Sequence, residues 1–128
     1  MRVLLDTQVL LWMFARSGRL SPTARDTLSN GDNELFFSIA GYWEIGIKAS
    51  LGKLRLAEGW EEVIPKEIAH NGIVWLPISP SHVHAVSQLP WPHRDPFDRI
   101  MIAQATAEEL AVVTSDTVFS DYPFDVVW

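Results

Sequence analysis

The sequence predicts an α/β protein in which helices cover both faces of a central, mainly parallel sheet of four to five strands, a three-layer α/β/α sandwich. Short apolar segments alternate along the chain with longer segments of helical periodicity, and this alternation is typical of parallel sheets. The 128 residues are 48% hydrophobic and 20% charged, which suits a single folded domain over 1–128. Ligands of such sheets bind beyond the carboxyl ends of the strands.

The first quarter of the chain contains one predicted strand and two helices. Residues 2–6, RVLLD, form a short buried strand that ends in an acid. Residues 7–15 form a helix with a wide apolar face. The Ser-Pro pair at 21–22 begins a second helix with an N-cap and a first-turn proline, and the Asn-Gly pair at 30–31 ends it.

The next segment contains the second strand and the helix that follows it. Residues 34–38, ELFFS, form the strand, and Ser38 is placed to cap a helix that runs to Gly52. Gly41 and Gly46 inside this helix each cost about 1 kcal/mol relative to alanine. A further helix is expected over 60–70, closed by Asn-Gly.

The second half repeats the alternation. Ser-Pro at 79–80 and Asp-Pro at 95–96 begin helices, and the second of these has the clearest apolar periodicity in the chain. The predicted elements here are a strand over 73–78, a helix over 79–89, a helix over 95–109, a strand over 111–116 and a strand over 124–128.

Composition excludes several classes of function. The chain has no cysteine, so disulfide scaffolds, thiolate metal sites and cysteine nucleophiles are ruled out, and a reducing, cytoplasmic location is compatible with this. The longest apolar run, Val9 to Ala15, is too short to span a membrane. The net charge of −6 disfavours a protein that simply coats nucleic acid. An acidic protein can still process nucleic acid when its carboxylates hold metal ions.

Four acids follow separate apolar segments: Asp6, Glu44, Asp98 and Asp116. Two stand at strand ends and two near helix starts, and we expect them to face one edge of the sheet. Carboxylates gathered in one pocket repel each other and need a cation. Oxygen ligands without cysteine favour Mg²⁺ or Mn²⁺, which suit metal-assisted hydrolysis of a phosphodiester.

Each acid also has an ordinary structural interpretation. Asp6 can cap the helix that follows it, and Asp116 can be a turn residue after a strand. Asp95 and Asp98 can be the N-cap and a first-turn acid of one helix. Glu44 stands four residues before a lysine and can form a surface ion pair, although its apolar neighbours suggest a half-buried position.

The chain carries, in this order, the motifs LLDTQVLLW, SIAGYWEIGIK, DPFDRIMIAQA and VVTSD. The ordered set resembles PIN-domain ribonucleases, and in detail VapC toxins of toxin–antitoxin pairs, over nearly the whole chain. The resemblance implies a PIN-like fold, a homodimer, a VapB-like antitoxin partner and Mg²⁺- or Mn²⁺-dependent cleavage of RNA. It assigns the acidic site to Asp6, Glu44, Asp98 and Asp116, with Thr114 and Ser115 as nearby polar residues and Asp95 as an additional candidate ligand.

Three cations beside these motifs are candidates to bind the phosphates of a substrate: Lys48, Arg94 and Arg99. Two alternatives remain open at this stage. A phospho-acceptor receiver-like domain also has an acidic pocket at strand ends, but it needs a lysine after a late strand, and no lysine follows Lys66 here. A non-catalytic interaction module with the same fold is the other alternative.

Overall fold

The computed structural model describes residues 1–90 and 95–128. Its sheet has five strands in the order β3-β2-β1-β4-β5, and every neighbouring pair is parallel, as the sequence predicts. The strands are β1 (Arg2–Leu5), β2 (Glu34–Ser38), β3 (Val74–Leu76), β4 (Ala111–Val113) and β5 (Val126–Val127).

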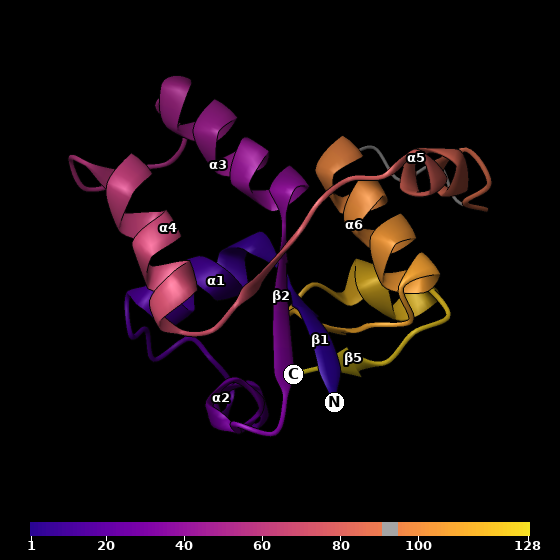
Figure 1. Cartoon of the computed structure of the whole chain (residues 1–128), viewed down its shortest axis with the longest axis horizontal. Coiled ribbons are helices and arrows are strands. Elements are labelled where there is room, and N and C mark those ends of the chain that lie inside the picture. The colour runs from indigo at the N-terminus through magenta and orange to yellow at the C-terminus, as the bar shows by residue number, and fades with distance from the viewer. Residues whose placement is uncertain (91–94) are drawn as a thin grey trace.

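Helices cover both faces of this sheet (Figure 1). The view is nearly along the edge of the sheet, with α1 and α4 on one side and α5 and α6 on the other. The helices are α1 (Thr7–Phe14), α2 (Pro22–Ser29), α3 (Ile39–Ser50), α4 (Trp60–His70), α5 (Pro80–Val86) and α6 (Pro96–Ala107), with a short 3₁₀ helix, η1 (Thr117–Asp121).

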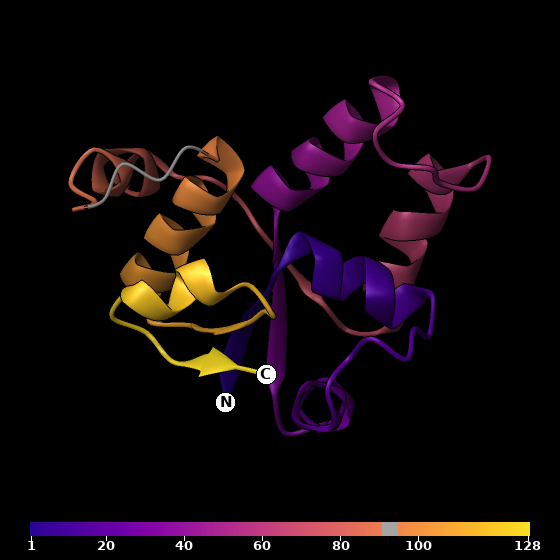
Figure 2. The same ribbon diagram turned by 180° about the vertical axis from the view of Figure 1, so that it is seen from behind.

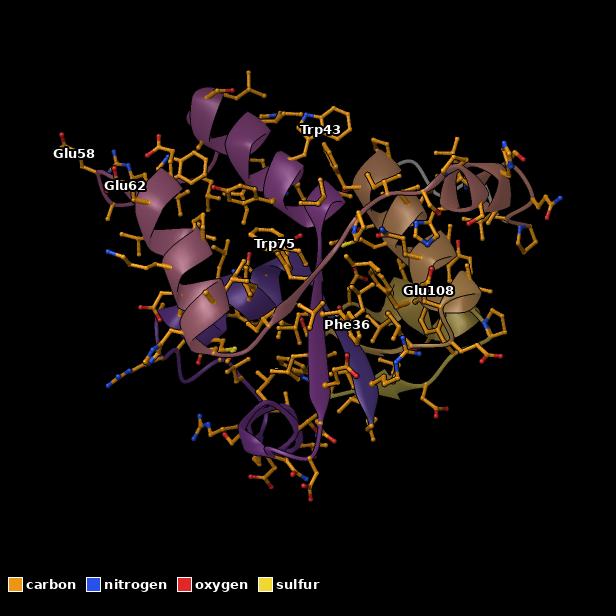
Figure 3. The ribbon with its side chains drawn as sticks, viewed as in Figure 1. Phe36, Trp43, Glu58, Glu62, Trp75 and Glu108 are labelled. Carbon is orange, nitrogen blue, oxygen red and sulfur yellow. The ribbon has the colours of Figure 1, made fainter. Side chains whose placement is uncertain are left out.

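The central strand separates two hydrophobic cores. Val3 and Leu5 of β1 pack with residues of α1, α2 and α4, whereas Leu4 packs with residues of α6 and η1. This alternation follows from the two-residue period of a strand and gives both faces an apolar surface. Figure 3 shows the same division on the neighbouring strands, with Phe36 and Trp75 on opposite sides of the sheet.

The predicted helix starts are confirmed by side-chain caps. The hydroxyl of Ser21 accepts a hydrogen bond from Ala24 N, and that of Ser79 accepts one from His82 N. The carboxylate of Asp95 caps α6 in the same way. Several elements are shorter than predicted: β3 covers three residues, α5 ends at Val86 and β4 ends at Val113.

The strand order places a switch point at the centre of the sheet. From β1 the chain moves to β2 and β3 on one side, and β4 and β5 add on the other side. The pairing of β1 with β4 continues beyond the strand, because Asp6 N donates a hydrogen bond of 3.1 Å to Val113 O. The carboxyl ends of β1 and β4 therefore form the edge at which a ligand site is expected. No helix in the described ranges is long and apolar enough to cross a membrane.

Candidate active site

An acidic cavity of about 220 Å³ lies at the switch point. Figure 2 shows the start of α1 and the start of α3 close together above the ends of β1 and β2. Its charged lining residues are Asp6, Glu44, Lys48, Asp95, Asp98 and Asp116. Five carboxylates from four different parts of the chain thus share one cavity with a single lysine in the described lining.

Asp6 stands at the N-cap position of α1, but its side chain makes no capping hydrogen bond. Its Oδ2 instead accepts a hydrogen bond of 2.8 Å from the hydroxyl of Thr114. Burial raises the pKa of Asp6 to about 6, and the negative charges of Glu44 and Asp116 add to this, while the Thr114 hydrogen bond opposes it. Desolvation is thus the main reason that the Asp6 carboxyl holds its proton more tightly than a free carboxyl group.

Thr114 connects the ends of the two central strands. Its side chain is 1% exposed, and its hydroxyl donates to Asp6 while accepting a hydrogen bond of 3.0 Å from Asp116 N. Both hydrogen-bonding functions of the hydroxyl are used, so the position of Asp6 depends on the turn that follows β4. Ser115, the neighbouring candidate, is exposed.

Glu44 is more deeply buried than the half-buried position expected from the sequence, at 5% exposure. Its Oε2 pairs with Lys48 Nζ at 2.7 Å, one turn further along α3. Glu44 is therefore buried and also forms the predicted ion pair with Lys48. The hydrogen bond to Glu44 raises the pKa of Lys48 against the effect of its desolvation, and the charges of Asp95 and Asp98 raise it further.

The carboxylates of Asp95 and Asp116 act as helix caps. Asp95 Oδ1 accepts hydrogen bonds from Phe97 N at 2.9 Å and Asp98 N at 3.2 Å at the start of α6. Asp116 Oδ1 accepts one of 3.0 Å from Val118 N at the start of η1. The capping interpretation is therefore confirmed for Asp95, while Asp116 follows β4 in a turn, as predicted, and also caps η1. Both side chains nevertheless line the cavity.

The donor set of the cavity fits a divalent cation in its chemistry. Within residues 1–90 and 95–128, no group of three or more His, Asp or Glu side chains converges closely enough to hold a metal ion as they stand. Most of these carboxylates are hydrogen-bonded to other groups of the protein. Asp6 bonds to Thr114 and Glu44 to Lys48, and the carboxylates of Asp95 and Asp116 accept from backbone amides. Most of the polar donors are carboxylate oxygens, which hard divalent cations prefer as ligands.

Of the candidate substrate-binding cations, Arg99 is not part of the lining of this cavity. The guanidinium of Arg99 donates a hydrogen bond of 2.9 Å to Val86 O, and Arg99 lines a different, apolar pocket beside Trp43 and Phe97. Arg94 lies outside the residues that the structure describes. Lys48 is the candidate that lines the acidic cavity.

Two further polar residues, Thr7 and Gln8, line the cavity, although no sequence motif singled them out. Their place directly after Asp6 is the signal that could have found them. The hydroxyl of Thr7 is buried without a hydrogen-bond partner in the described part of the chain. An added Cβ at Gly41 would lie 2.9 Å from that hydroxyl and 2.8 Å from the Phe37 ring, so glycine lets α3 approach α1 closely.

The fold and the carboxylate-lined switch point define an α/β protein with a candidate site for phosphodiester chemistry. A family model described as the PIN domain matches residues 3–125. The chain therefore belongs to the PIN-domain family.

Three of the solved structures with the same fold are similar over nearly the whole chain. VapBC2 from Rickettsia felis, bound to a promoter DNA fragment, has a TM-score of 0.72 at 14% identity, covering 98% of this chain and 97% of that one. A toxin-antitoxin complex from Klebsiella pneumoniae has a TM-score of 0.61 at 20% identity, covering 90% and 87%. FitAcB from Neisseria gonorrhoeae has a TM-score of 0.58 at 18% identity, covering 97% and 95%. At these identities the likeness establishes the fold, and no curated protein sequence matches significantly.

Proposed function

We propose that this protein is a metal-dependent endoribonuclease that acts as the toxin of a toxin–antitoxin pair. The observation that carries the proposal is the gathering of five carboxylates around one cavity at the switch point of a PIN-domain fold. Carboxylates gathered in one cavity repel each other, and a bound cation would offset that repulsion. The negative charge of the cavity would repel a phosphate group, so it also argues against a site that binds phosphate without a metal.

Asp6, Glu44, Asp98 and Asp116 are the side chains that would hold Mg²⁺ or Mn²⁺. The bound ion would activate water and offset the charge that develops on the phosphate. Thr114 keeps the Asp6 carboxylate at the end of β1 through its hydrogen bond. The Lys48 ammonium is about half exposed at the rim, so it can approach a substrate phosphate while it pairs with Glu44.

The partner proposal rests on the structural relatives and on an exposed apolar surface. One similar structure is a toxin-antitoxin complex from Klebsiella pneumoniae, and another is VapBC2 from Rickettsia felis bound to a promoter DNA fragment. Large apolar side chains of this chain lie exposed, among them Trp43 at 61% and Leu51 at 63%. Contiguous exposed apolar groups mark interaction surfaces, and Trp43 lines one apolar pocket together with the exposed Ile78 and Val83. An antitoxin and a second copy of the chain are both proposed partners.

The receiver-like alternative is disfavoured by the topology of the sheet. Receiver domains have the strand order 2-1-3-4-5. The order here is 3-2-1-4-5, with β1 at the centre of the sheet. The absence of a lysine after Lys66 and the strand order both argue against a receiver-like domain. We therefore favour the nuclease proposal.

The test is cleavage of an RNA mixture by the purified protein with Mn²⁺, with Mg²⁺ and with EDTA. We expect cleavage with either ion, none with EDTA, and a loss of at least about 100-fold in Asp98→Asn. The matched control is Asp26→Asn, which removes one exposed acid on α2 and should cleave like the wild type. Cleavage that persists in Asp98→Asn, or that needs no metal, contradicts the proposal. Addition of the partner encoded beside this gene should abolish cleavage if the toxin assignment is right.

A further inference from the structure

A buried polar contact joins the two helices that carry Glu44 and Asp98. Ser38 Oγ donates a hydrogen bond of 2.6 Å to Gln104 Oε1, and both residues are 0% exposed. Ser38 is the N-cap of α3, and Gln104 lies in the second half of α6. The residues around them, including Ala40, Met101 and Ala105, are apolar. A polar pair in such a place must have all its hydrogen bonds satisfied, or it costs stability.

Each side-chain polar atom of this pair has a hydrogen-bond partner. The hydroxyl of Ser38 accepts from Ala40 N at 3.0 Å while it donates to Gln104. The Gln104 amide nitrogen donates to Pro77 O at 3.3 Å, on the segment that follows β3. The amide is therefore anchored on both its atoms. Apolar contacts tolerate sliding of one helix over another, but this set of bonds fixes one position of α6 relative to α3 and the sheet.

The geometry of the two helices relates this contact to the acidic cavity. Glu44 is six residues after Ser38, and Asp98 is six residues before Gln104. At 1.5 Å per residue, each acid lies about 9 Å along its own helix from the polar pair. The rings of Trp43 and Phe97 form a second contact, with centroids 5.2 Å apart, one residue before each acid. Figure 3 shows Trp43 extending from α3 on the side of α6.

The two contacts show that α3 and α6 run in opposite directions. The later residue on α3, Trp43, meets the earlier residue on α6, Phe97, while Ser38 meets Gln104. Glu44 and Asp98 therefore lie at about the same distance from the sheet along their helices. The hydrogen bond between Ser38 and Gln104, nearer the sheet, fixes how far α6 is displaced along α3. A shift of α6 along α3 would separate Glu44 from Asp98 directly.

We propose that Gln104 is a positioning residue that holds Asp98 opposite Glu44 for metal binding. The inference rests on the proposed function, because it assigns to Gln104 a role in forming that same site. Gln104 does not line the cavity. It acts through α6, as a group that orients ligands without touching the ion.

The test compares Gln104→Met with the wild type in two measurements, the Mn²⁺ dissociation constant by calorimetry and the kcat and KM for RNA. Methionine preserves length and apolar packing but removes both hydrogen bonds of the amide. We expect the dissociation constant to rise about 10-fold and kcat to fall about 10-fold, with KM changed less than about twofold. Gln104→Glu should restore Mn²⁺ affinity, because a neutral carboxyl group in this buried place offers the same acceptor and donor.

The matched control is Leu28→Ala, a truncation in the opposite core that also lowers stability. It should leave Mn²⁺ affinity unchanged, since no residue of α2 lines the cavity. Should Gln104→Met fail to fold, Ser38→Ala removes the same hydrogen bond from the other helix and must weaken Mn²⁺ binding in the same direction. An unchanged dissociation constant in the folded variant, or an equal loss in Leu28→Ala, overturns the positioning role while the nuclease proposal stands. A wild-type protein that binds no Mn²⁺ and cleaves no RNA overturns the proposed function itself.

Discussion

Asp6 combines an N-cap backbone conformation with a carboxylate that turns away from the helix to meet Thr114. The sequence could place Asp6 at the end of a strand, because that depends on local pattern alone. It could not reveal the Thr114 partner, which is 108 residues away in the chain. The contact exists only because β1 and β4 are neighbours in the sheet. The local sequence therefore predicts a helix cap at Asp6, whereas in the folded protein its side chain bonds to Thr114, which follows the neighbouring strand.

The raised pKa of Asp6 predicts how the metal-free protein responds to pH. Its folded-state pKa of about 6 lies above the ordinary value of 3.8. The contribution of Asp6 to stability is therefore fully present below about pH 4 and is lost as the pH rises through about 6. Asp6→Asn removes the buried charge and keeps an oxygen to accept from Thr114. In EDTA at pH 8 we expect this variant to be more stable than the wild type by about 2–3 kcal/mol.

Urea denaturation of both proteins in EDTA at pH 4 and pH 8 measures this difference. At pH 4 the two should have nearly the same free energy of unfolding, since the Asp6 carboxyl is then largely protonated in the folded wild type. Asp26→Asn controls for the loss of one acid elsewhere. A variant less stable than the wild type at pH 8 would show that the Asp6 charge is already neutralised within the protein.

Arg99 illustrates a residue-scale prediction that helix geometry could have refined. Its place directly after Asp98 in the sequence predicts that Arg99 binds a phosphate of the substrate. Adjacent residues on a helix do not share a face. The structure accordingly turns Arg99 toward α5, where its guanidinium binds Val86 O.

At the scale of the elements, helix starts were the most predictable features. The caps at Ser21, Ser79 and Asp95 depend on the residue itself and on amides two or three positions later, so local sequence is sufficient. Strand ends were predicted less well. The strand expected over 111–116 ends at Val113, because the side chains of Thr114 and Asp116 bond to the backbone of the turn and begin η1. These turn hydrogen bonds are local, but the β-branched residues 112–114 favour a strand, so the sequence alone predicts one that is too long.

Asp95 allows the capping role to be separated from a role in the active site. Asp95→Ala removes the acceptor for two backbone amides at the start of α6 and should cost about 1 kcal/mol of stability. Asp95→Asn keeps an acceptor and should stay within about 0.5 kcal/mol of the wild type. We expect the asparagine variant to retain most RNA cleavage. Thermal unfolding and cleavage rates, measured on both variants, check this; loss of cleavage in Asp95→Asn would instead make Asp95 a ligand.

At the scale of the whole molecule, alternation of strands and helices was enough to predict a parallel sheet covered on both faces. The position of β1 between β2 and β4 was not predictable in the same way, because strand order depends on which apolar faces pack together. That order is what brings the acids into one cavity. The family motifs indicated the set of acids, and the fold supplies a physical reason for their proximity.

Net charge poses a further question at this scale. The chain carries −6 overall, and no lysine or arginine follows Arg99. Bulk attraction therefore cannot draw a polyanion to the protein. A divalent ion in the acidic cavity would offset part of the local negative charge and offer a phosphate oxygen a cation, with Lys48 as a second positive group. The function of the molecule as a whole thus depends on whether the cavity binds a metal.

Anomalous diffraction from crystals grown with millimolar Mn²⁺ tests this central claim most directly. The account predicts a manganese peak inside the cavity, within about 2.2 Å of carboxylate oxygens of Asp6 and Asp98, and with Glu44 and Asp116 turned toward it. The ion should be absent from crystals of Asp98→Asn grown in the same way. An empty cavity in the wild-type crystal, with Glu44 still paired to Lys48 and Asp116 still capping η1, would contradict the account.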